Sequence, residues 1–426
     1  MTPGLASDST HFSQIAQTVR TLAPGEWDAW FRALEVAFGG TGEPPEARQL
    51  WHDLTEVDRA QGVWEGAVPV AGSGAFSLRM TVPGGAVVPV AGVTMVGVLP
   101  THRRRGLLTA MMRRQLDDIR ARGEALAVLT ASEPAICGRF GYGLGTLRVS
   151  LDIESRRLSL PAPPADGARL RLADPAESGP ACEELYAARV PLRPGMLERR
   201  PGWERLPLLD GPAHRDGASP LQVVLAEDGR SGRLLGYARY QVKDESTGRS
   251  AAGVVLVRDV EALSPQVYAR LWSYLLEIDL TDRVKAGSRP VDDPLFHLVS
   301  DTRRLNPELG DSLYVRLVEV GTALRLREYA APVEVVLEVA DEFCPWNAGR
   351  WKLQAGGPGK EATCLPTTAA AELALTVREL GSAYLGGMTL AALGAAGRVT
   401  ELRGGALAEA SRAFASDVAP WLPHGF

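Results

Sequence analysis

The segment from residue 89 to residue 123 constrains the fold most, because it joins a buried strand, a basic turn and a helix with one apolar face. Residues 89–98 form a nearly continuous series of small apolar side chains, which is typical of a strand buried on both faces. Apolar residues recur at helical spacing over 107–119, and the helix is expected to end near Gly123. A second buried strand follows over 125–130. This order predicts a right-handed β-α-β unit with parallel strands.

The turn between that strand and that helix has the composition of an anion site. Three consecutive arginines, Arg103 to Arg105, precede Gly106, where the helix is expected to begin. Amides at a helix N-terminus lack helical partners, the helix dipole adds roughly half a positive charge, and arginines donate charge-assisted hydrogen bonds. Gly106 also lets a phosphate approach the backbone, since no Cβ stands in the way. A bound phosphate group is therefore predicted, with a solvated basic turn as the alternative; the dinucleotide pattern G-x-G-x-x-G is absent.

The rest of the chain alternates strand and helix patterns, which predicts an α+β fold. Helical patterns over 26–38 and 49–57 precede a strand pattern over 75–82. A second block, from about 170 to 306, repeats strands and a helix but has no Arg-x-x-Gly turn after its long strand. Its strand patterns cover 221–226, 234–242 and 253–260, and its helix carries apolar residues from 268 to 276. A third block begins near Leu313, with strand patterns at 313–320, 333–339, 351–353 and 373–377 and helices starting at Gly321, Thr367 and Ala406.

Charge and composition exclude several classes of function. The formal net charge of -5 argues against a general nucleic-acid binder, because neutralising phosphates requires a basic surface. Residues 1–10 lack the basic start and apolar stretch of a secretory signal, and no segment has about 18 uninterrupted apolar residues. We therefore expect no membrane span and a cytoplasmic location. The histidines share no metal-like spacing and the cysteines form no C-x-x-C pair, so neither a metal site nor a disulfide is predicted.

Several motifs resemble those of one acetyltransferase family. Arg103-x-x-Gly106-x-Leu108 is similar to the pyrophosphate loop of the GNAT superfamily, in which Gly or Ala is usual at the position of Leu108. Pro-Thr-His-Arg-Arg-Arg-Gly-Leu-Leu (100–108), Ala-Ser-Glu (131–133) and Gly-Arg-Phe-Gly-Tyr-Gly (138–143) resemble the Eis family, bacterial multi-acetylating N-acetyltransferases. The likeness extends over nearly the whole chain, through residues 293–298, 301–303, 314–317, 384–387 and 413–418.

The resemblance implies an organisation into three domains and an activity. We expect tandem GNAT-like domains at 1–155 and 156–307, of which only the first has a cofactor site, and a sterol-carrier-like domain at 308–426 whose C-terminus enters the active site. The family assembles as a homohexamer. Its activity implies acetyl-CoA as the donor and, as acceptor, an amine of a small molecule such as an aminoglycoside, or a lysine side chain.

The resemblance also implies which residues hold the cofactor. The backbones of Val96 and Val98 would bind the pantetheine arm in a gap where two parallel strands splay apart, and Ser132 would lie at the thioester end. The residues expected at the pyrophosphate are Arg103, Arg104, Gly106, Leu107 and Leu108.

Two groups are candidates for proton transfer. In the family the base is the chain's terminal carboxylate, which here belongs to Phe426; the apolar tail 420–426 favours burial, with simple packing as the alternative. The family's acid is a tyrosine just before the 138–143 motif, where this chain has Cys137. A thiol has an ordinary pKa of ~8.5 against ~10 for tyrosine, so Cys137 can in principle serve as the acid. Alternatively Tyr142 or water replaces the acid, Cys137 is a nucleophile for other chemistry, or Cys137 is a small buried hydrophobe.

The acceptor pocket departs from the family pattern. Trp51 and Phe38 match aromatic pocket positions, with core packing as the alternative for either. Family members that act on aminoglycosides carry acidic anchors where this chain has Gly40 and Gly425. A second hypothesis is therefore a GNAT-fold biosynthetic or CoA-binding protein with a diverted acceptor or chemistry and little aminoglycoside acetylation.

Overall fold

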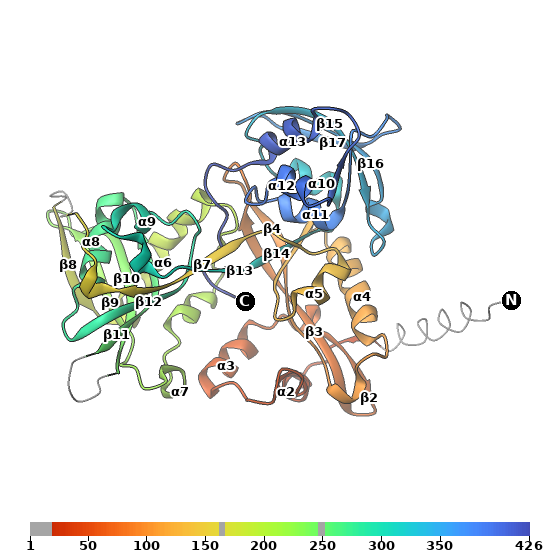
Figure 1. Cartoon of the computed structure of the whole chain (residues 1–426). Coiled ribbons are helices and arrows are strands. Elements are labelled where there is room, and N and C mark those ends of the chain that lie inside the picture. The colour runs from red at the N-terminus through yellow and green to blue at the C-terminus, as the bar shows by residue number, and fades with distance from the viewer. Residues whose placement is uncertain (1–18, 162–166, 246–251) are drawn as a thin grey trace. The chain divides into compact units, whose positions relative to one another are not determined.

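A computed structural model describes residues 19–161, 167–245 and 252–426 (Figure 1). Contacts between residues divide this part of the chain into two compact units. The first contains the described residues up to Gly145, then Leu313–Ser416, together with Phe426. The second contains Thr146–Ser312 and Asp417–Gly425. The chain therefore leaves the first unit and returns to it.

The first unit contains a seven-stranded mixed sheet. Its strands in spatial order are β1 (Arg20–Thr21), β2 (Gln61–Glu65), β3 (Val68–Thr81), β4 (Val87–Val98), β5 (Leu126–Thr130), β14 (Leu313–Leu317) and β6 (Gly143–Leu144). β4 and β5 are parallel, and α4 (Leu107–Ala121) connects them. The predicted strand, turn, helix and strand are thus confirmed, with the helix beginning one residue after Gly106.

Two α-helices lie between β1 and β2 in the chain. In α2 (Trp27–Ala37) the side chains of Trp27, Trp30, Phe31 and Leu34 form one buried stripe at helical spacing, as predicted. α3 (Pro45–Leu54) begins earlier than the predicted 49, because Pro45 occupies the first helical turn, where a missing N–H costs nothing. β3 also begins seven residues before the predicted strand 75–82.

The second unit contains another seven-stranded sheet. Its strands in spatial order are β13 (Glu308–Asp311), β7 (Leu147–Glu154), β12 (Thr281–Arg289), β11 (Gly253–Ala262), β10 (Leu234–Asp244), β9 (Gln222–Asp228) and β8 (Ala168–Ala173). Its helices are α6 (Pro175–Arg189), α7 (Pro212–Arg215), α8 (Pro265–Leu276) and α9 (Leu295–Leu298). β11 and β12 are parallel and α8 connects them, which repeats the β4, α4 and β5 arrangement.

The helix that follows the long strand of this second sheet has a closed N-terminus. Ser264 caps α8 by accepting a hydrogen bond from the Val267 N–H at 3.3 Å, and Pro265 has no N–H. α4 has Gly106 at the same position and no side-chain cap. Fewer free amide donors remain at the start of α8, in agreement with the missing Arg-x-x-Gly turn.

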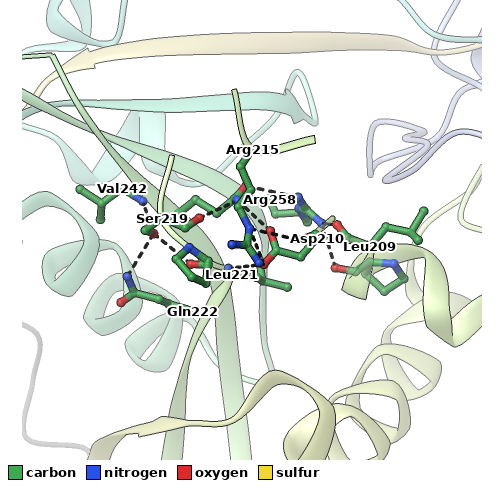
Figure 2. Close-up of polar contacts among 11 residues, drawn as sticks. Leu209, Asp210, Arg215, Ser219, Leu221, Gln222, Val242 and Arg258 are labelled. Carbon is green, nitrogen blue, oxygen red and sulfur yellow. Dashed lines mark hydrogen bonds and ion pairs between the residues drawn. The ribbon is translucent and has the colours of Figure 1, made fainter. Parts of the chain in front are cut away.

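A polar network holds the segment that leads into β9 (Figure 2). Asp210 Oδ2 accepts hydrogen bonds from Arg215 Nη2 at 2.9 Å and from the Leu221 N–H at 2.8 Å. Arg258 donates to the carbonyl of Leu209. Asp210 and Arg258 thus bind the protein's own backbone, and the network fixes the entry to the strand.

A five-stranded sheet and four helices form the C-terminal part of the first unit. The strands in spatial order are β17 (Ala362–Pro366), β16 (Gly349–Gly356), β15 (Pro332–Ala340), β18 (Leu373–Thr376) and β19 (Val399–Glu401). The helices are α10 (Val320–Arg325), α11 (Val377–Ala383), α12 (Leu390–Ala395) and α13 (Ala406–Phe414).

The helix predicted to start at Thr367 is wrong. Residues 367–372 form a connector, and the next helix, α11, begins at Val377. A capping box explains the position, because the Thr376 side chain accepts from the helix backbone and Glu379 bonds back to Thr376. The alanine-rich sequence after Thr367 favours a helix locally, but pairing of β18 with β15 overrides that preference.

The sheets divide the chain differently from the predicted boundaries at 155 and 307. β7 pairs with β12 and β13 in the second sheet, although the predicted boundary at 155 places its residues in the first domain. β14 was expected to open the third block, but it lies in the first sheet between β5 and β6. Hydrophobic periodicity shows that a strand is buried, whereas its partners depend on the whole fold.

Candidate functional site

The parallel pairing of β4 with β5 is short. Its register covers only Ala91 opposite Ala127 and Gly92 opposite Val128. β4 continues to Val98 beyond this point, so the two parallel strands part after Gly92. This is the part of the sheet in which a gap beside the Val96 and Val98 backbones is predicted.

A β-bulge occurs in β4 within this gap. Its register with β3 moves from Gly74 opposite Thr94 to Gly72 opposite Gly97, so Met95 and Val96 together face a single residue of β3. Met95 has φ +54°, a left-handed conformation that is costly for a residue with a side chain. A bulge bends the strand and turns its backbone groups away from the ladder. Nothing in the sequence around Met95 indicated it.

The turn after β4 presents the start of α4. Residues 100–102 form one 3-10 turn, and Arg104 and Gly106 then adopt left-handed backbone conformations, with φ +63° and +80°. Because Gly106 has no side chain, the first amides of α4 have no cap. Leu107 is buried and anchors the helix, while Leu108 packs at the edge of the core. The predicted anion site therefore has both its open helix end and its glycine.

The arginines of this turn differ in their contacts. Arg103 Nε donates to the Val98 carbonyl at 3.4 Å and its Nη2 to the Ala37 carbonyl at 3.3 Å. Arg105 Nη2 donates to the Thr101 carbonyl at 3.0 Å. All three arginines are exposed, so the turn before the helix carries three positive charges at the protein surface. Arg103 and Arg105 thus shape the turn while adding positive charge.

The segment after β5 brings Cys137 to the residues of the gap. Ser132 is exposed in the turn that follows the strand, and α5 (Pro134–Cys137) comes next. The side chains of Val96, Leu108 and Cys137 pack against one hydrophobic cluster, whose buried members include Phe140. The predicted pantetheine and acid positions therefore share one core.

The thiol of Cys137 is half-buried and uncharged. Burial is the main cause that raises its pKa, and the nearby Arg139 charge opposes this only in part. A protonated thiol can donate a proton to a leaving thiolate, whereas nucleophilic attack requires the thiolate form. The environment thus favours the acid role over the nucleophile role.

Tyr142 is more deeply buried than Cys137. Its side chain is fully buried in the same cluster, and its hydroxyl has no hydrogen-bond partner among the described residues. Burial raises the pKa of Tyr142 strongly, although the Arg316 charge acts in the opposite direction. A side chain without exposed surface has no route to a substrate in this conformation, so its burial counts against Tyr142 as the acid.

Phe426 lies against β4 just before the bulge. Thr94 Oγ1 donates to an oxygen of the Phe426 terminal carboxylate at 3.3 Å. The Phe426 ring lies over Gly92, where an added Cβ would be 3.1 Å from it. The carboxyl group is therefore two to four residues along the strand from Val96 and Val98. Gly92 and Thr94 are functional candidates that sequence reasoning missed, because a glycine and a threonine inside a strand pattern carry no local signal.

The two residues predicted to bind the acceptor lie near adjacent strands, Phe38 near β4 and Trp51 near β3. Phe38 is 57% exposed and lies beside Gly97 of β4. Trp51 is half-buried and stacks on Phe76 of β3, with ring centroids 6.3 Å apart. Phe76 is directly opposite Gly92 in the sheet. Phe38 thus offers free aromatic surface, whereas Trp51 is partly used in packing.

Comparison with known proteins agrees with this arrangement. Two acetyltransferase (GNAT) domain families match residues 18–145 and 195–325, and a sterol carrier protein domain matches residues 320–423. An uncharacterized N-acetyltransferase of Streptomyces avermitilis is 58% identical over 96% of this chain and 99% of its own length. N-acetyltransferase Eis of Mycobacterium tuberculosis is 36% identical over 94% of this chain and 98% of its own length. The chain belongs to the Eis family of GNAT N-acetyltransferases.

The solved structures give the same result for the fold. Eis1 from Mycobacterium abscessus superposes with a TM-score of 0.82 at 35% identity, covering 96% of this chain and all of that one. The predicted α+β fold, with tandem GNAT domains and a sterol-carrier-like domain, is thereby confirmed, as is an Eis-type acetyltransferase activity.

The described part of this Eis-family chain has neither a metal-binding cluster nor a membrane-spanning helix. Within the described ranges, no three His, Cys, Asp or Glu side chains are grouped so that they could hold a metal ion. No helix in the same ranges has the length and apolar character needed to cross a bilayer.

We predict that Gly106→Asp abolishes the binding of coenzyme A. The substitution adds a negative charge at the open end of α4 and a side chain at φ +80°. Isothermal calorimetry should show affinity reduced on the order of 100-fold or more. Gly123→Asp is the matched control, because Gly123 has φ +77° just after the same helix and no atom within 4 Å of an added Cβ. Equal losses in both variants would contradict an anion site at Gly106.

We predict that Tyr142→Phe leaves acetyl transfer intact and does not destabilise the protein. The change removes a buried hydroxyl that has no partner in the described structure, and relief of such a group is worth about 1 kcal/mol. Thermal unfolding and turnover measure the two effects. A large loss of turnover at unchanged stability would restore Tyr142 as a catalytic candidate.

Proposed function

We propose that this Eis-family protein transfers an acetyl group from acetyl-CoA to the nitrogen of an amine on a small molecule or a lysine side chain. The observation that carries the proposal is the parting of β4 from β5 in front of an uncapped helix, with Phe426 against β4 and with Cys137 packed against the same hydrophobic cluster as Val96. The open helix end fits a pyrophosphate, and the gap fits an extended chain that bonds to strand backbone.

The donor side uses backbone more than side chains. Free amides at the start of α4 and the charge of Arg103 and Arg104 would hold the pyrophosphate of acetyl-CoA. The backbones of Val96 and Val98 would bond to the amides of the pantetheine arm, with Ser132 near the thioester. Bound in this way, acetyl-CoA supplies an activated acetyl group, and the protein supplies its orientation.

The carboxyl group of Phe426 is proposed as the base. An alkyl amine is protonated at neutral pH and must lose a proton before its nitrogen can attack the thioester carbonyl. The hydrogen bond from Thr94 and the contact of the ring with Gly92 support this role, since they hold the carboxyl group beside the gap.

Cys137 is proposed as the acid. As the new C–N bond forms and the C–S bond breaks, the electron pair passes to the sulfur of coenzyme A, and the Cys137 thiol gives that sulfur its proton. Solvent then reprotonates Cys137. A thiol and the leaving thiolate have similar proton affinities, so the transfer is close to balanced.

A second candidate function is a diverted acceptor. Gly40 and Gly425 have no charge to bind a polycationic aminoglycoside, whereas Phe38 presents an exposed aromatic ring. These features favour an acceptor with an apolar or aromatic part. Thiol release measured over a panel of amines separates the two functions, and rapid turnover of several aminoglycosides would exclude the second.

The homohexamer and the cytoplasmic location remain predictions. Light scattering of the purified protein at several concentrations tests the first, with a particle of six chains expected. A stable monomer would contradict it.

We predict an alkaline limit to turnover that depends on Cys137. The acid is active only when protonated, and its pKa is raised, so kcat should fall as the pH increases above the ordinary range of a thiol. Cys137→Ala should reduce kcat on the order of 100-fold and remove that limit, while the KM for acetyl-CoA changes little. Cys364→Ala, a buried cysteine in β17, is the control.

Cys137→Tyr gives the complementary measurement. Tyrosine keeps its proton to a higher pH than a thiol, so kcat should be retained or raised and the alkaline limit should move upward. A full loss of turnover in Cys137→Tyr would indicate that the thiol has another chemical role.

We predict that one glycine added after Phe426 strongly reduces turnover. The added residue displaces the carboxyl group by about 3.5 Å along the chain. Acetyl-CoA affinity, measured by calorimetry, should change little, and Phe426→Tyr is the control because it keeps the chain length. Unchanged kcat in the extended protein would show that this carboxyl group is not the base.

A further inference from the structure

The loop that carries Cys137 has little structure of its own. Cys137 is the last residue of the four-residue helix α5, residues 138–140 form a single 3-10 turn, and the loop ends in β6, a strand of two residues. Its internal backbone bonds are the Gly141 N–H to the Gly138 carbonyl at 3.2 Å and the Tyr142 N–H to the Cys137 carbonyl at 3.4 Å. Such a loop needs external support to hold a thiol at a fixed place.

The first support is β14, which fills the sheet between β5 and β6. It pairs with the whole of β5 on one side and with Gly143 and Leu144 on the other. The strand that leads to the thioester end and the strand that ends the Cys137 loop are thus two strand spacings apart, roughly 9.6 Å.

The second support is a buried ion pair that begins on β14. The side chains of Arg316 and Asp341 are 0% and 2% exposed, and Arg316 Nη2 lies 2.7 Å from Asp341 Oδ2. Asp341 also accepts from Asn347 Nδ2 at 3.0 Å and from the Cys344 N–H at 2.9 Å. These bonds fix the direction of the guanidinium.

The guanidinium of Arg316 lies against the backbone of the Cys137 loop. A Cβ added at Gly141 would be 2.9 Å from both Cζ and Nε of Arg316. Gly141 has φ +83°, so this position excludes a side chain both by conformation and by space. The Arg316 guanidinium therefore lies close to the loop backbone at Gly141, four residues after Cys137.

The turn that holds Asp341 also contacts the helix of the anion site. Arg113 of α4 donates to the Phe343 carbonyl and its guanidinium lies 4.1 Å from the centroid of the Phe343 ring. Arg120 of the same helix lies 4.5 Å from the Trp346 ring centroid. One turn thus touches α4 on one side and directs Arg316 toward the Cys137 loop on the other.

We propose that Arg316 is a positioning residue, which together with Asp341 sets the Cys137 loop relative to α4 and so places the thiol for proton transfer. The inference rests on the proposed function and deepens it. Stability alone does not account for a charge at this position, because replacing a buried ion pair by uncharged groups is often neutral. A flat, rigid guanidinium in contact with a glycine backbone instead suits the placement of a loop.

A double variant separates positioning from stability. Arg316→Met alone leaves the Asp341 carboxylate buried and unpaired, so loss of folding is expected. Arg316→Met with Asp341→Asn removes both charges and keeps an acceptor for the Cys344 N–H. We expect the double variant to recover the thermal stability that the single variant loses. Its kcat should stay at least 10-fold below that of the parent protein, while its KM for acetyl-CoA is unchanged. Arg316→Lys should give an intermediate kcat.

The control is a second buried ion pair of the same unit. Arg59 Nη2 lies 2.6 Å from Glu124 Oε2, and both side chains are at least nine-tenths buried. Arg59→Met with Glu124→Gln should change stability in the same way but leave kcat as in the parent. Parental kcat in the folded Arg316 and Asp341 double variant would overturn the proposal.

Alkylation of Cys137 gives a measurement that does not depend on turnover. Cys137 is half-buried, and iodoacetamide labelling at this residue can be followed by peptide mass spectrometry. In the Arg316 and Asp341 double variant the loop loses its contact with the guanidinium, so Cys137 should be alkylated several-fold faster than in the parent protein. In the Arg59 and Glu124 double variant, Cys137 should react at the parental rate. An unchanged rate of Cys137 labelling in the Arg316 and Asp341 double variant would overturn the role of Arg316. A parent protein without acetyltransferase activity would contradict only the proposed function, because labelling does not require turnover.

Discussion

The separation of two parallel strands is the constraint on which the rest of the site depends. β4 and β5 pair through two residue positions and then diverge, and the bulge at Met95 interrupts the pairing of β4 with β3, which resumes at Gly97 and Val98. Backbone groups that would normally complete the sheet thereby remain available for a ligand that binds like a strand. The open end of α4 follows soon after this stretch of β4, and the Phe426 carboxyl group lies against its beginning at Thr94.

Burial assigns different tasks to similar groups around the gap. Cys137 keeps part of its surface and a proton, whereas Tyr142, five residues later, is enclosed in the core. Likewise α4 and α8 follow equivalent strands, but Ser264 closes the start of α8 and Gly106 leaves α4 open. The Ser264 side chain thus uses an amide of α8 within the protein, whereas the absence of a side chain at Gly106 leaves the amides of α4 free for a ligand.

Much of the donor side could be predicted from the sequence, because its signals are local. The apolar strand, the arginine turn and the amphipathic helix are contiguous, and the structure has them within one or two residues of the expected positions. The bulge at Met95 and the role of Gly92 could not be predicted, since both depend on the register with other strands. The same limit explains β14, whose buried pattern was clear although its sheet was not, and the false helix at Thr367, where local preference competed with pairing of β18.

The place of β14 between β5 and β6 has a consequence for how this protein is made. β5 ends at Thr130 and β6 at Leu144, yet the strand that joins them comes from residues 313–317, more than 160 positions later. During synthesis both strands emerge first with one edge unpaired, and such edges are open to pairing with other chains. The first GNAT sheet is therefore not an autonomous folding unit, because its completion requires β14, which is synthesised only after residues 146–312 of the second unit.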